Sequence, residues 1–275
     1  MALATLTELT KYSQEHSVGI GMFNIVNLEF ASAIFEAAQE TGIPAIFGIP
    51  ERFMQYYSAD VMAQACKTLL KNAKVPMAIH LDHGKHFEGV MTALRAGFTS
   101  VMFDGSALPY EENVARTAEI VKIAHAMGVS VEGELGYVGR SGVDELSPDG
   151  FTKPGQAEEF VARTGVDALA IAIGNQHGQY KGVPKLDFDR LCDIRSRVEC
   201  GLVLHGGTGI PDEDFVRAVK CGINKINIYT AMDVAAREFN TGHFGNYKAY
   251  LDYTRDLKGV VKDVVKKHIM LFAVN

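Results

Sequence analysis

The stretch IHLDHGK, residues 79–85, ends an apolar run with two histidines, an aspartate and a glycine. The run itself, PMAIHLD at 76–82, has the length and apolar character of a buried β-strand. A buried strand that stops on titratable side chains is typical of α/β proteins, whose functional groups follow the carboxyl ends of parallel strands. If this chain is such a protein, further strands with polar ends should alternate with helices along it.

Seven further apolar runs have this length, and stretches with helical apolar spacing lie between them. Several helical stretches end in a glycine, as in AGF (96–98) and TGV (164–166), where glycine can adopt the left-handed conformation that ends a helix. We expect strands at 18–24, 44–49, 76–82, 100–105, 129–136, 168–174, 202–207 and 224–230. The clearest helices are expected at Leu28–Thr41, Ala59–Asn72, Phe87–Ala96, Glu111–Met127, Gln156–Thr164, Phe188–Arg197 and Glu213–Cys221, with a further amphipathic helix from Asp252.

This alternation decides the expected fold. Eight strand–helix units predict an α/β protein with one (β/α)8 TIM barrel domain over residues 1–275 and a C-terminal helical extension. The 275 residues, 47% of them apolar, suffice for one large core. An open doubly wound sheet is the alternative, but no G-x-G-x-x-G pattern follows the first expected strand.

Charge and composition exclude several classes of partner. The formal net charge is −6, and the 27 basic and 33 acidic residues are spread along the chain, so no basic stripe is available for nucleic acid. The apolar runs are too short for a membrane span, and the start, MALATLTELTKYSQEH (1–16), carries polar residues too early for a signal peptide. The four cysteines form no C-x-x-C pattern, which favours reduced thiols in the cytoplasm.

The strand ends test the barrel hypothesis, because active-site groups of such barrels gather at the carboxyl ends of the strands. Seven of the eight expected strands end on side chains capable of chemistry, whereas chance would scatter such residues over both ends. These residues are Asn24, Asp82, His83, Asp104, Glu132, Glu134, His177, His205, Asn227 and Thr230. We therefore expect a polar site at one mouth of the barrel.

Three of these residues, His83, His177 and His205, each precede a glycine. Imidazole suits zinc and related divalent ions, and three neutral nitrogens leave a position open for a substrate or water. The alternative is three unrelated histidines with ordinary hydrogen bonds. Their common position at strand ends favours a metal site.

The neighbouring polar residues have several possible roles. Asp82, beside the first histidine, could orient a ligand or move a proton. Asp104 and Glu134 could hold a second ion, bond the metal ligands, or only cap the loops that follow them. His80 shares the strand face of Asp82, and we expect it to be a hydrogen-bonded core group.

A phosphate pocket is expected on the last two strands. The glycine-rich HGGTG (205–209) precedes a helix, so its backbone N–H groups and the Thr208 hydroxyl can bind an anion. NIYT (227–230) follows the eighth strand, and barrels often bind phosphate with the loops after strands seven and eight. Lys181, in HGQYKG (177–182), could add a positive charge.

Several motifs together resemble one enzyme family, the class II, metal-dependent ketose-bisphosphate aldolases, which include the fructose- and tagatose-bisphosphate enzymes. The resemblance extends in order from about Phe23 to the C-terminal helix. The motifs are HLDHG (80–84), SVMFDGS (100–106), VEGELG (131–136), ARTGVDALAIAIG (162–174), HGQYKGVPKLDF (177–188), LHGGTG (204–209) and KINIYT (225–230).

The resemblance implies a TIM barrel that reversibly cleaves a ketose phosphate to dihydroxyacetone phosphate and an aldehyde. It implies Zn²⁺ on His83, His177 and His205, acting as a Lewis acid on the dihydroxyacetone phosphate oxygens. Asp82 would exchange a proton with the C4 hydroxyl. Because members of the family form dimers and tetramers, it also implies a homodimer or homotetramer.

Other positions match further parts of the family's site. Asp104 and Glu134 match additional acidic positions at the metal, and Asn24 matches an asparagine that contacts substrate. The family's pocket for phosphate and a monovalent cation, Na⁺ or K⁺, is matched by Gly178, Lys181, Gly206, Thr208, Asn227 and Thr230.

The loop after the fifth strand departs from the family pattern. Members commonly carry there a glutamate, after a glycine pair, that exchanges a proton on dihydroxyacetone phosphate. Here the loop is GYVGRSGVDELSPDGF (136–151), and the pair is lost. We expect Glu145 to be the carbon acid/base, with Asp144 as the second candidate; the alternative is that both carboxylates only face solvent.

Three further departures fall where the family holds the aldehyde end of its substrate. Tyr229 replaces a polar or acidic residue, Lys248 precedes alanine where an Arg-Lys pair is usual, and the segment around Arg52 replaces a Q-S motif. Lysine does not reproduce the bidentate contact of arginine. We therefore expect Arg52, Tyr229 and Lys248 to determine specificity, and the aldehyde to lack a phosphate or to carry a carboxylate or sulfonate.

Three other functions are the alternatives. The chain could be an ordinary fructose- or tagatose-bisphosphate aldolase, or a non-catalytic barrel that binds zinc and sugar phosphate. A metal-dependent hydrolase barrel is disfavoured, because the first strand, GMFNIV (21–26), lacks the H-x-H pair that such sites tend to use.

Overall fold

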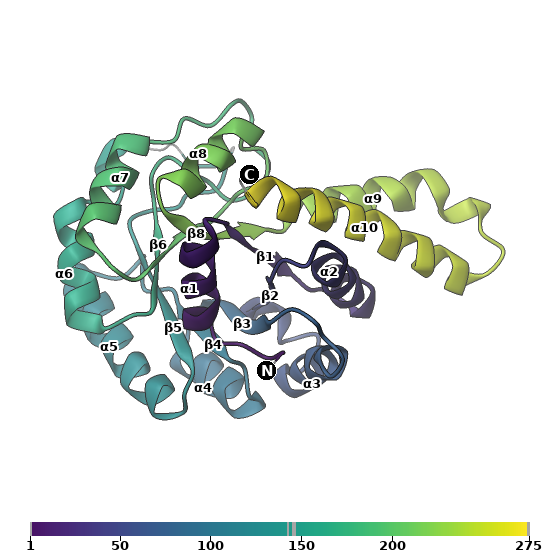
Figure 1. Ribbon diagram of the computed structural model, residues 1–275, viewed down its shortest axis with the longest axis horizontal. Helices are drawn as coiled ribbons and strands as arrows, with labels where there is room; N and C mark the ends of the chain where they lie inside the picture. Colours follow the sequence, from purple (N-terminus) through teal and green to yellow (C-terminus); the bar gives the residue numbers. More distant parts are fainter. Residues whose placement is uncertain (1, 142, 145–146, 274–275) are drawn as a thin grey trace.

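The computed structural model describes residues 2–141, 143–144 and 147–273. Eight parallel strands pair in chain order, and β8 pairs with β1 to close a barrel (Figure 1). They are β1 (Ile20–Asn24), β2 (Ala45–Pro50), β3 (Met77–Gly84), β4 (Ser100–Phe103), β5 (Ser130–Leu135), β6 (Ala168–Ile171), β7 (Gly201–Leu204) and β8 (Ile223–Ile228). The barrel prediction is confirmed, and the open-sheet alternative is wrong.

Helices surround the barrel (Figure 1). They are α2 (Leu28–Thr41), α3 (Ala59–Leu70), α4 (Phe87–Ala96), α5 (Tyr110–Ala126), α6 (Pro154–Thr164), α7 (Phe188–Arg197) and α8 (Asp212–Lys220), all within two residues of the expected bounds. The Asn27 side chain begins α2 by accepting a hydrogen bond from the backbone of Phe30. The expected glycine caps are present at Gly97 and Gly165, with φ of 78° and 70°.

The strands are buried on both faces. Every residue of β1, β2 and β4 to β8 is buried, because helices cover the outside and side chains fill the inside. This burial explains why the strands appear in the sequence as continuous apolar runs. Polar residues inside them are therefore exceptions that need partners, and His80, Glu132 and Lys225 are the fully buried ones with ionisable side chains on β3, β5 and β8.

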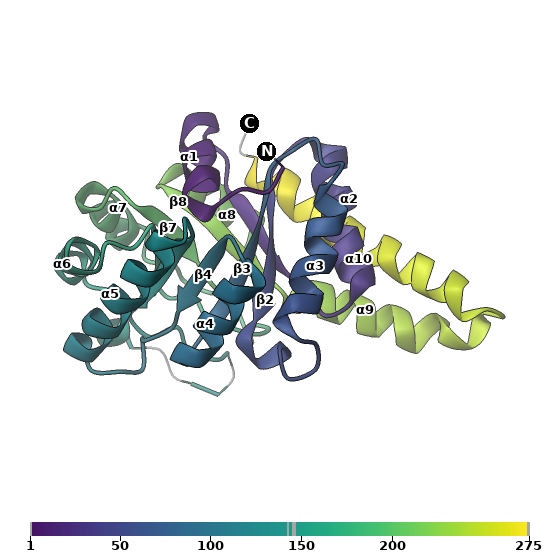
Figure 2. The same ribbon diagram turned by 90° about the horizontal axis from the view of Figure 1, so that it is seen from below.

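Helix α1 (Leu6–His16) covers the amino end of the barrel (Figures 1 and 2). Its Thr7 N–H donates to Ser130 Oγ at the start of β5, over 3.1 Å. The sequence patterns above did not predict this helix, although its capping box of Thr5 and Glu8 is a recognisable start signal. Because α1 occupies the amino end, the opposite end of the barrel is the one available for a site.

Helices α9 (Thr230–His243) and α10 (Tyr250–Phe272) form a hairpin that projects from the barrel, here called the arm (Figures 1 and 2). The predicted C-terminal helix is confirmed and begins at Tyr250, whereas α9 was not predicted. Val261, Val265 and Ile269 of α10 are buried, and α10 packs on α2. None of the described helices combines the length and apolarity that a bilayer-spanning segment requires.

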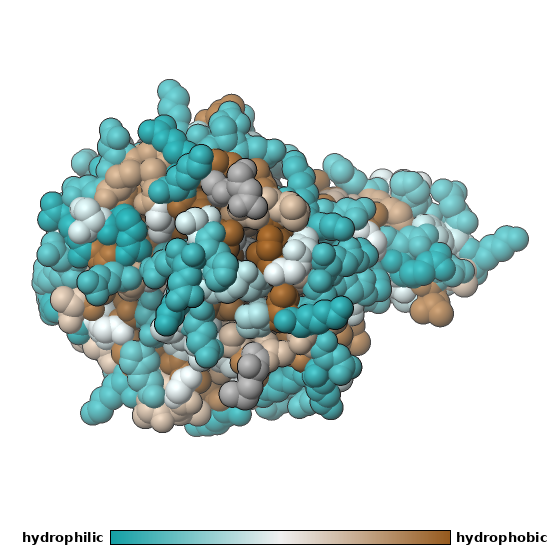
Figure 3. All heavy atoms as spheres, in the orientation of Figure 1, coloured by the Kyte–Doolittle hydropathy of each residue, from teal (hydrophilic) through white to brown (hydrophobic). Residues whose placement is uncertain are grey.

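The outer end of the arm exposes large apolar side chains. Phe244, Tyr250 and Leu251 are 54%, 71% and 78% exposed. Figure 3 shows mostly hydrophilic side chains over the face that carries α1, with apolar atoms at the base of the arm and near its end. The end of the arm therefore presents an apolar surface that the chain itself does not cover.

Candidate active site

Three histidines meet at the carboxyl end of the barrel. His83 is the second-last residue of β3, His177 follows β6 and His205 follows β7. Each ring contributes one nitrogen to a group of three nitrogens that lie within 4.8 Å of one another. The ring centroids are 4.8–5.8 Å apart. The structure thus brings together the three residues that the sequence singled out.

The backbone of His83 has an unusual conformation. Its φ is 48°, one of two positive values for non-glycine residues among those described. The register between β3 and β4 shifts between Leu81 and Gly84, so His83 leaves the regular strand. Its Nδ1 lies 3.0 Å from Asp104 Oδ2. Strained backbone of this kind clusters at functional sites, and here it aims the ring at the other two histidines.

The protonation states of the rings differ. Burial lowers the pKa of His83, but the neighbouring Asp82 and Asp104 carboxylates outweigh it and raise the pKa to about 9. Burial and the His83 charge lower the pKa of His177 to about 4, and they hold the pKa of His205 well below its ordinary value. At neutral pH His83 therefore carries two ring protons and a positive charge, whereas His177 and His205 are neutral.

This arrangement fits a divalent cation. His83 Nε2 and His205 Nδ1 face each other at 3.2 Å, so a proton or a metal ion must lie between their lone pairs. Glu134 Oε2 is buried and has no hydrogen-bond partner among the described residues. It lies 3.9 Å from His83 Nδ1 and 4.0 Å from His205 Nδ1. Imidazole nitrogens with a nearby carboxylate are the donors that zinc prefers.

A second group of donors shares His83. His83, Asp104 and Glu134 also offer ligand atoms within 4.8 Å of one another. Burial and the Asp104 charge raise the pKa of Glu134 to about 8, although the nearby His83 charge opposes them. Asp104 also accepts from the Ser106 hydroxyl at 2.6 Å. Both carboxylates could thus serve an ion or hold His83.

Asp82 is positioned by two asparagines. Its Oδ2 accepts from Asn24 Nδ2 at 2.9 Å, and its Oδ1 accepts from Asn227 Nδ2 at 3.3 Å. Burial raises the pKa of Asp82, but the charges of His83 and Lys225 and the hydrogen bond from Asn24 outweigh it and lower the pKa overall. The carboxylate is therefore ionised, fixed in direction and able to accept a proton beside the histidines.

The residues of the predicted phosphate pocket come from three segments, after β6, β7 and β8. Gly206 has a φ of 65°, and a Cβ there would overlap the carbonyl oxygen of Gln176. Thr208 Oγ1 accepts from the backbone of Ala231, in the first turn of α9, and Thr230 begins that helix. Gly178, with a φ of 91°, and Lys181 lie in the loop after β6.

Tyr180, which the sequence interpretation missed, ties two of these segments together. Its hydroxyl accepts from the Gln176 backbone at 2.7 Å and donates to Gly206 O at 3.1 Å. Burial raises the pKa of Tyr180 to about 12, so the hydroxyl stays protonated. No signal in the sequence distinguishes this tyrosine from an ordinary loop residue.

The loop after β5 is joined to a metal-site histidine. His177 N–H donates to Gly139 O at 2.8 Å, and Ser141 N–H donates to His177 O at 2.9 Å. Asp144 is half-buried and accepts from the Arg140 backbone. Glu145 lies outside the described residues, so the choice between Glu145 and Asp144 stays a prediction.

Two of the three specificity candidates lie close together. The Arg52 guanidinium is 4.9 Å from the Phe53 ring centroid, and that ring is 5.9 Å from the Tyr229 ring. Lys248 lies instead in the connection between α9 and α10, at the outer end of the arm (Figures 1 and 2). Lys248 therefore does not reach the mouth of its own barrel.

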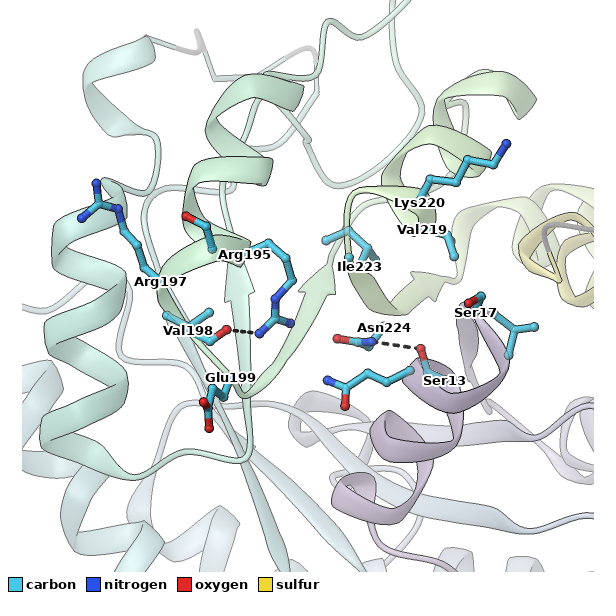
Figure 4. A pocket seen from close by; sticks show the side chains of 14 residues that line it. Ser13, Ser17, Arg195, Arg197, Val198, Glu199, Val219, Lys220, Ile223 and Asn224 are labelled. Atoms are coloured by element: carbon cyan, nitrogen blue, oxygen red, sulfur yellow. Dashed lines mark hydrogen bonds between the residues drawn. The ribbon is translucent and has the colours of Figure 1, made fainter.

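A cavity of about 940 Å³ lies at the other end of the molecule, beside α1 and the amino ends of β7 and β8 (Figure 4). Arg195 in its wall donates to the carbonyl oxygens of Val198 and Cys200, and Asn224 donates to Ser13 Oγ. Arg195 thus joins α7 to the connection before β7, and Asn224 joins β8 to α1. The cavity contains none of the candidate site residues.

Comparisons with known proteins identify the family of the chain. A family model, fructose-bisphosphate aldolase class-II, matches residues 4–275. The fructose-bisphosphate aldolase of Staphylococcus aureus is 42% identical over 281 residues, covering 99% of this chain and 98% of its own. The crystal structure of the YdjI aldolase from Escherichia coli K12 superposes with a TM-score of 0.89 at 35% identity, covering 98% of this chain and 97% of its own. The chain therefore belongs to the class II fructose-bisphosphate aldolase family, whose members are aldehyde lyases.

Proposed function

We propose that this protein is a zinc-dependent aldolase that reversibly cleaves a ketose phosphate to dihydroxyacetone phosphate and an aldehyde. The observation that carries the proposal is the ionised Asp82, fixed by Asn24 and Asn227 beside three convergent histidine nitrogens. In this proposal His83, His177 and His205 hold Zn²⁺, with Asp104 and Glu134 beside it. The ion would act as a Lewis acid that stabilises the enediolate of dihydroxyacetone phosphate.

The protein's own groups would then move the protons. In cleavage, Asp82 accepts the proton of the C4 hydroxyl as the C3–C4 bond breaks; in synthesis it returns that proton to the aldehyde oxygen. Glu145, or Asp144, exchanges the proton on the carbon of dihydroxyacetone phosphate. The phosphate binds to Gly178, Lys181, Gly206, Thr208 and Thr230, with Asn227 beside them. A monovalent cation, Na⁺ or K⁺, binds in the same pocket.

Proton exchange separates this proposal from a non-catalytic barrel that binds zinc and sugar phosphate. The active enzyme is expected to exchange a proton of dihydroxyacetone phosphate with deuterium from D₂O, observed by NMR. A chelator should stop the exchange and added Zn²⁺ should restore it. Binding of dihydroxyacetone phosphate without exchange would support the non-catalytic alternative.

We further propose that the aldehyde differs from glyceraldehyde 3-phosphate. Strands β2 and β8 flank β1, so Arg52 and Tyr229 extend from the same sector of the barrel as Asn24, which holds Asp82. Substrate atoms beyond C4 would point into this sector. Arg52 has no carboxylate partner among the described residues, and a guanidinium suits a carboxylate or sulfonate.

Rates with three aldehydes test this specificity. Together with dihydroxyacetone phosphate, succinic semialdehyde and glyceraldehyde are expected to give higher kcat/KM than glyceraldehyde 3-phosphate. Arg52→Ala should reduce the rate with succinic semialdehyde about tenfold and leave glyceraldehyde unchanged, whereas Arg52→Lys should restore only part of it. A preference for glyceraldehyde 3-phosphate would make the protein an ordinary fructose- or tagatose-bisphosphate aldolase; the Staphylococcus aureus relative is named as a fructose-bisphosphate aldolase.

The assembly and location complete the proposal. The exposed apolar end of the arm favours a homodimer or homotetramer, in which Lys248 could approach the mouth of a neighbouring copy. The four cysteines are unpaired, which suits the cytoplasm. A small sugar phosphate is the proposed partner, and we expect neither nucleic acid nor a membrane.

A further inference from the structure

An ion pair is buried inside the barrel, below the three histidines. Lys225 Nζ on β8 lies 2.8 Å from Glu132 Oε2 on β5, and neither side chain has any exposed surface. The other oxygen, Glu132 Oε1, lies 2.8 Å from His205 Nε2. The pair therefore connects directly to one of the candidate metal ligands.

Stability alone does not account for this pair. Two charges lose their hydration when they are buried, and apolar residues of similar volume are often as stable or more stable in their place. Around the pair, His80 Nδ1 bonds to Ser100 Oγ at 2.8 Å, and His80 Nε2 is 3.6 Å from Glu132 Oε2. Glu132 is thus hydrogen-bonded by Lys225 and His205, and the His80 ring lies beside it without a hydrogen bond.

The pair determines which nitrogen of His205 carries hydrogen. With the Lys225 ammonium as its counter-charge, the Glu132 carboxylate can only accept, so His205 Nε2 must donate. His205 Nδ1 then keeps its lone pair, and it is this atom that faces His83 Nε2 at 3.2 Å. A reversed tautomer would turn an N–H toward the position where an ion would be bound.

We propose that Glu132 and Lys225 are positioning residues of the metal centre, which fix the ring and the tautomer of His205 so that Nδ1 is presented to the ion. The inference rests on the proposed function, because it assumes that the three histidines bind a metal. Hydrogen-bond partners of this kind raise metal affinity about 10- to 100-fold in other proteins.

A double variant tests the proposal without leaving one charge buried alone. Glu132→Leu with Lys225→Met removes both charges and the acceptor for His205 Nε2. We expect the affinity for Co²⁺, measured by competition with a chelator, to fall about 10- to 100-fold, and the d–d absorption spectrum of the Co²⁺ protein to change. Circular dichroism and thermal unfolding would show that the variant is folded.

Two further variants keep the test decisive. Glu132→Gln with Lys225→Met preserves the shape of the core, but a glutamine can present either its oxygen or its nitrogen to His205. Its Co²⁺ affinity should lie between those of the wild type and the Leu/Met variant, and it replaces that variant if the latter does not fold. Asn224→Ala, next to Lys225 on β8, removes a buried hydrogen bond to Ser13 at the other end of the barrel and should leave Co²⁺ binding unchanged.

The outcomes separate this inference from the proposed function. A folded double variant with wild-type Co²⁺ affinity and spectrum would overturn the positioning role. A wild-type protein that binds neither Co²⁺ nor Zn²⁺ would instead contradict the proposed metal-dependent function. An equal loss in Asn224→Ala would mean that general destabilisation weakens binding, and this too would overturn the proposal.

Discussion

At the scale of single residues, the site depends on carboxylates with different environments. Asp82 is ionised because the His83 charge and the Asn24 hydrogen bond favour its carboxylate, whereas burial and the Asp104 charge raise the pKa of Glu134 to about 8. Paired carboxylates whose pKa values are pushed apart can divide the roles of proton acceptor and metal ligand. The two residues should therefore respond differently to substitution.

Asp82→Asn should separate the two proton transfers. Because the proposed role of Asp82 is at the C4 hydroxyl, we expect kcat for cleavage to fall about 10²- to 10⁴-fold. The exchange of the carbon proton of dihydroxyacetone phosphate should persist within a few-fold. Glu145→Gln is the matched variant and should lose both activities; loss of exchange in Asp82→Asn would show that Asp82 does not act at the hydroxyl alone.

Gly206→Ala should damage the phosphate pocket. The positive φ of Gly206 and the nearby Gln176 carbonyl leave no room for a side chain, so we expect a loss of about 1–3 kcal/mol of stability and a higher KM for dihydroxyacetone phosphate. Urea unfolding and steady-state kinetics measure the two effects. Gly155→Ala, in α6 where a Cβ meets no atom within 4 Å, is the control: it should leave KM unchanged and lose no stability, because alanine favours a helix more than glycine does.

At the scale of elements, the periodicity of the sequence predicted the strands and the surrounding helices, because burial on both faces gives strands an apolar pattern that helices do not share. It did not predict α1 or α9. The start of α1 has a capping box, but α9 follows β8 directly and has little buried surface beyond Met232, so its apolar pattern is weak.

Parts of the site could not be predicted in the same way. The histidines and Asp82 were recognisable, because strand ends of a barrel meet at one mouth. The contact of Arg52 and Phe53 with Tyr229 joins segments far apart in the chain, so only the folded chain reveals it. Lys225 is a lysine inside an apolar strand, and this position in the sequence is the signal of a buried ion pair that the strand pattern alone does not predict.

Thr5→Ala tests the role assigned to α1. The Thr5 hydroxyl and the Glu8 carboxylate cap this helix, and α1 packs on the end of the barrel opposite to the histidines. We expect a loss of about 0.5–2 kcal/mol in the free energy of unfolding, measured with urea, and an unchanged kcat/KM. A changed kcat/KM in a folded protein would mean that α1 influences the site as well as the fold.

At the scale of the whole molecule, the barrel and the arm have different surfaces. The arm projects from the barrel (Figure 1), and exposed aromatic and aliphatic side chains lie at its end. Single exposed apolar residues are normal, but a group of them on a projecting hairpin indicates an interface. A neighbouring copy of the chain is the partner that we propose.

Leu251→Asp should therefore weaken the assembly. We expect light scattering to show a homo-oligomer for the wild type and a smaller species for the variant, because a charge would be buried in the interface. Met127→Asp, at an exposed apolar position at the end of α5, is the control and should leave the mass unchanged. A monomeric wild type at micromolar concentration would contradict the proposed interface.

The most direct test of the proposed reaction is the formation of the carbon–carbon bond itself. The purified protein would be stripped of metal, mixed with dihydroxyacetone phosphate and an aldehyde, and assayed for the ketose phosphate with and without Zn²⁺, alongside His177→Ala. We expect product only with Zn²⁺ and wild-type protein. Product formed at the same rate by the stripped protein, or by His177→Ala, would contradict a metal-dependent aldolase built on these three histidines.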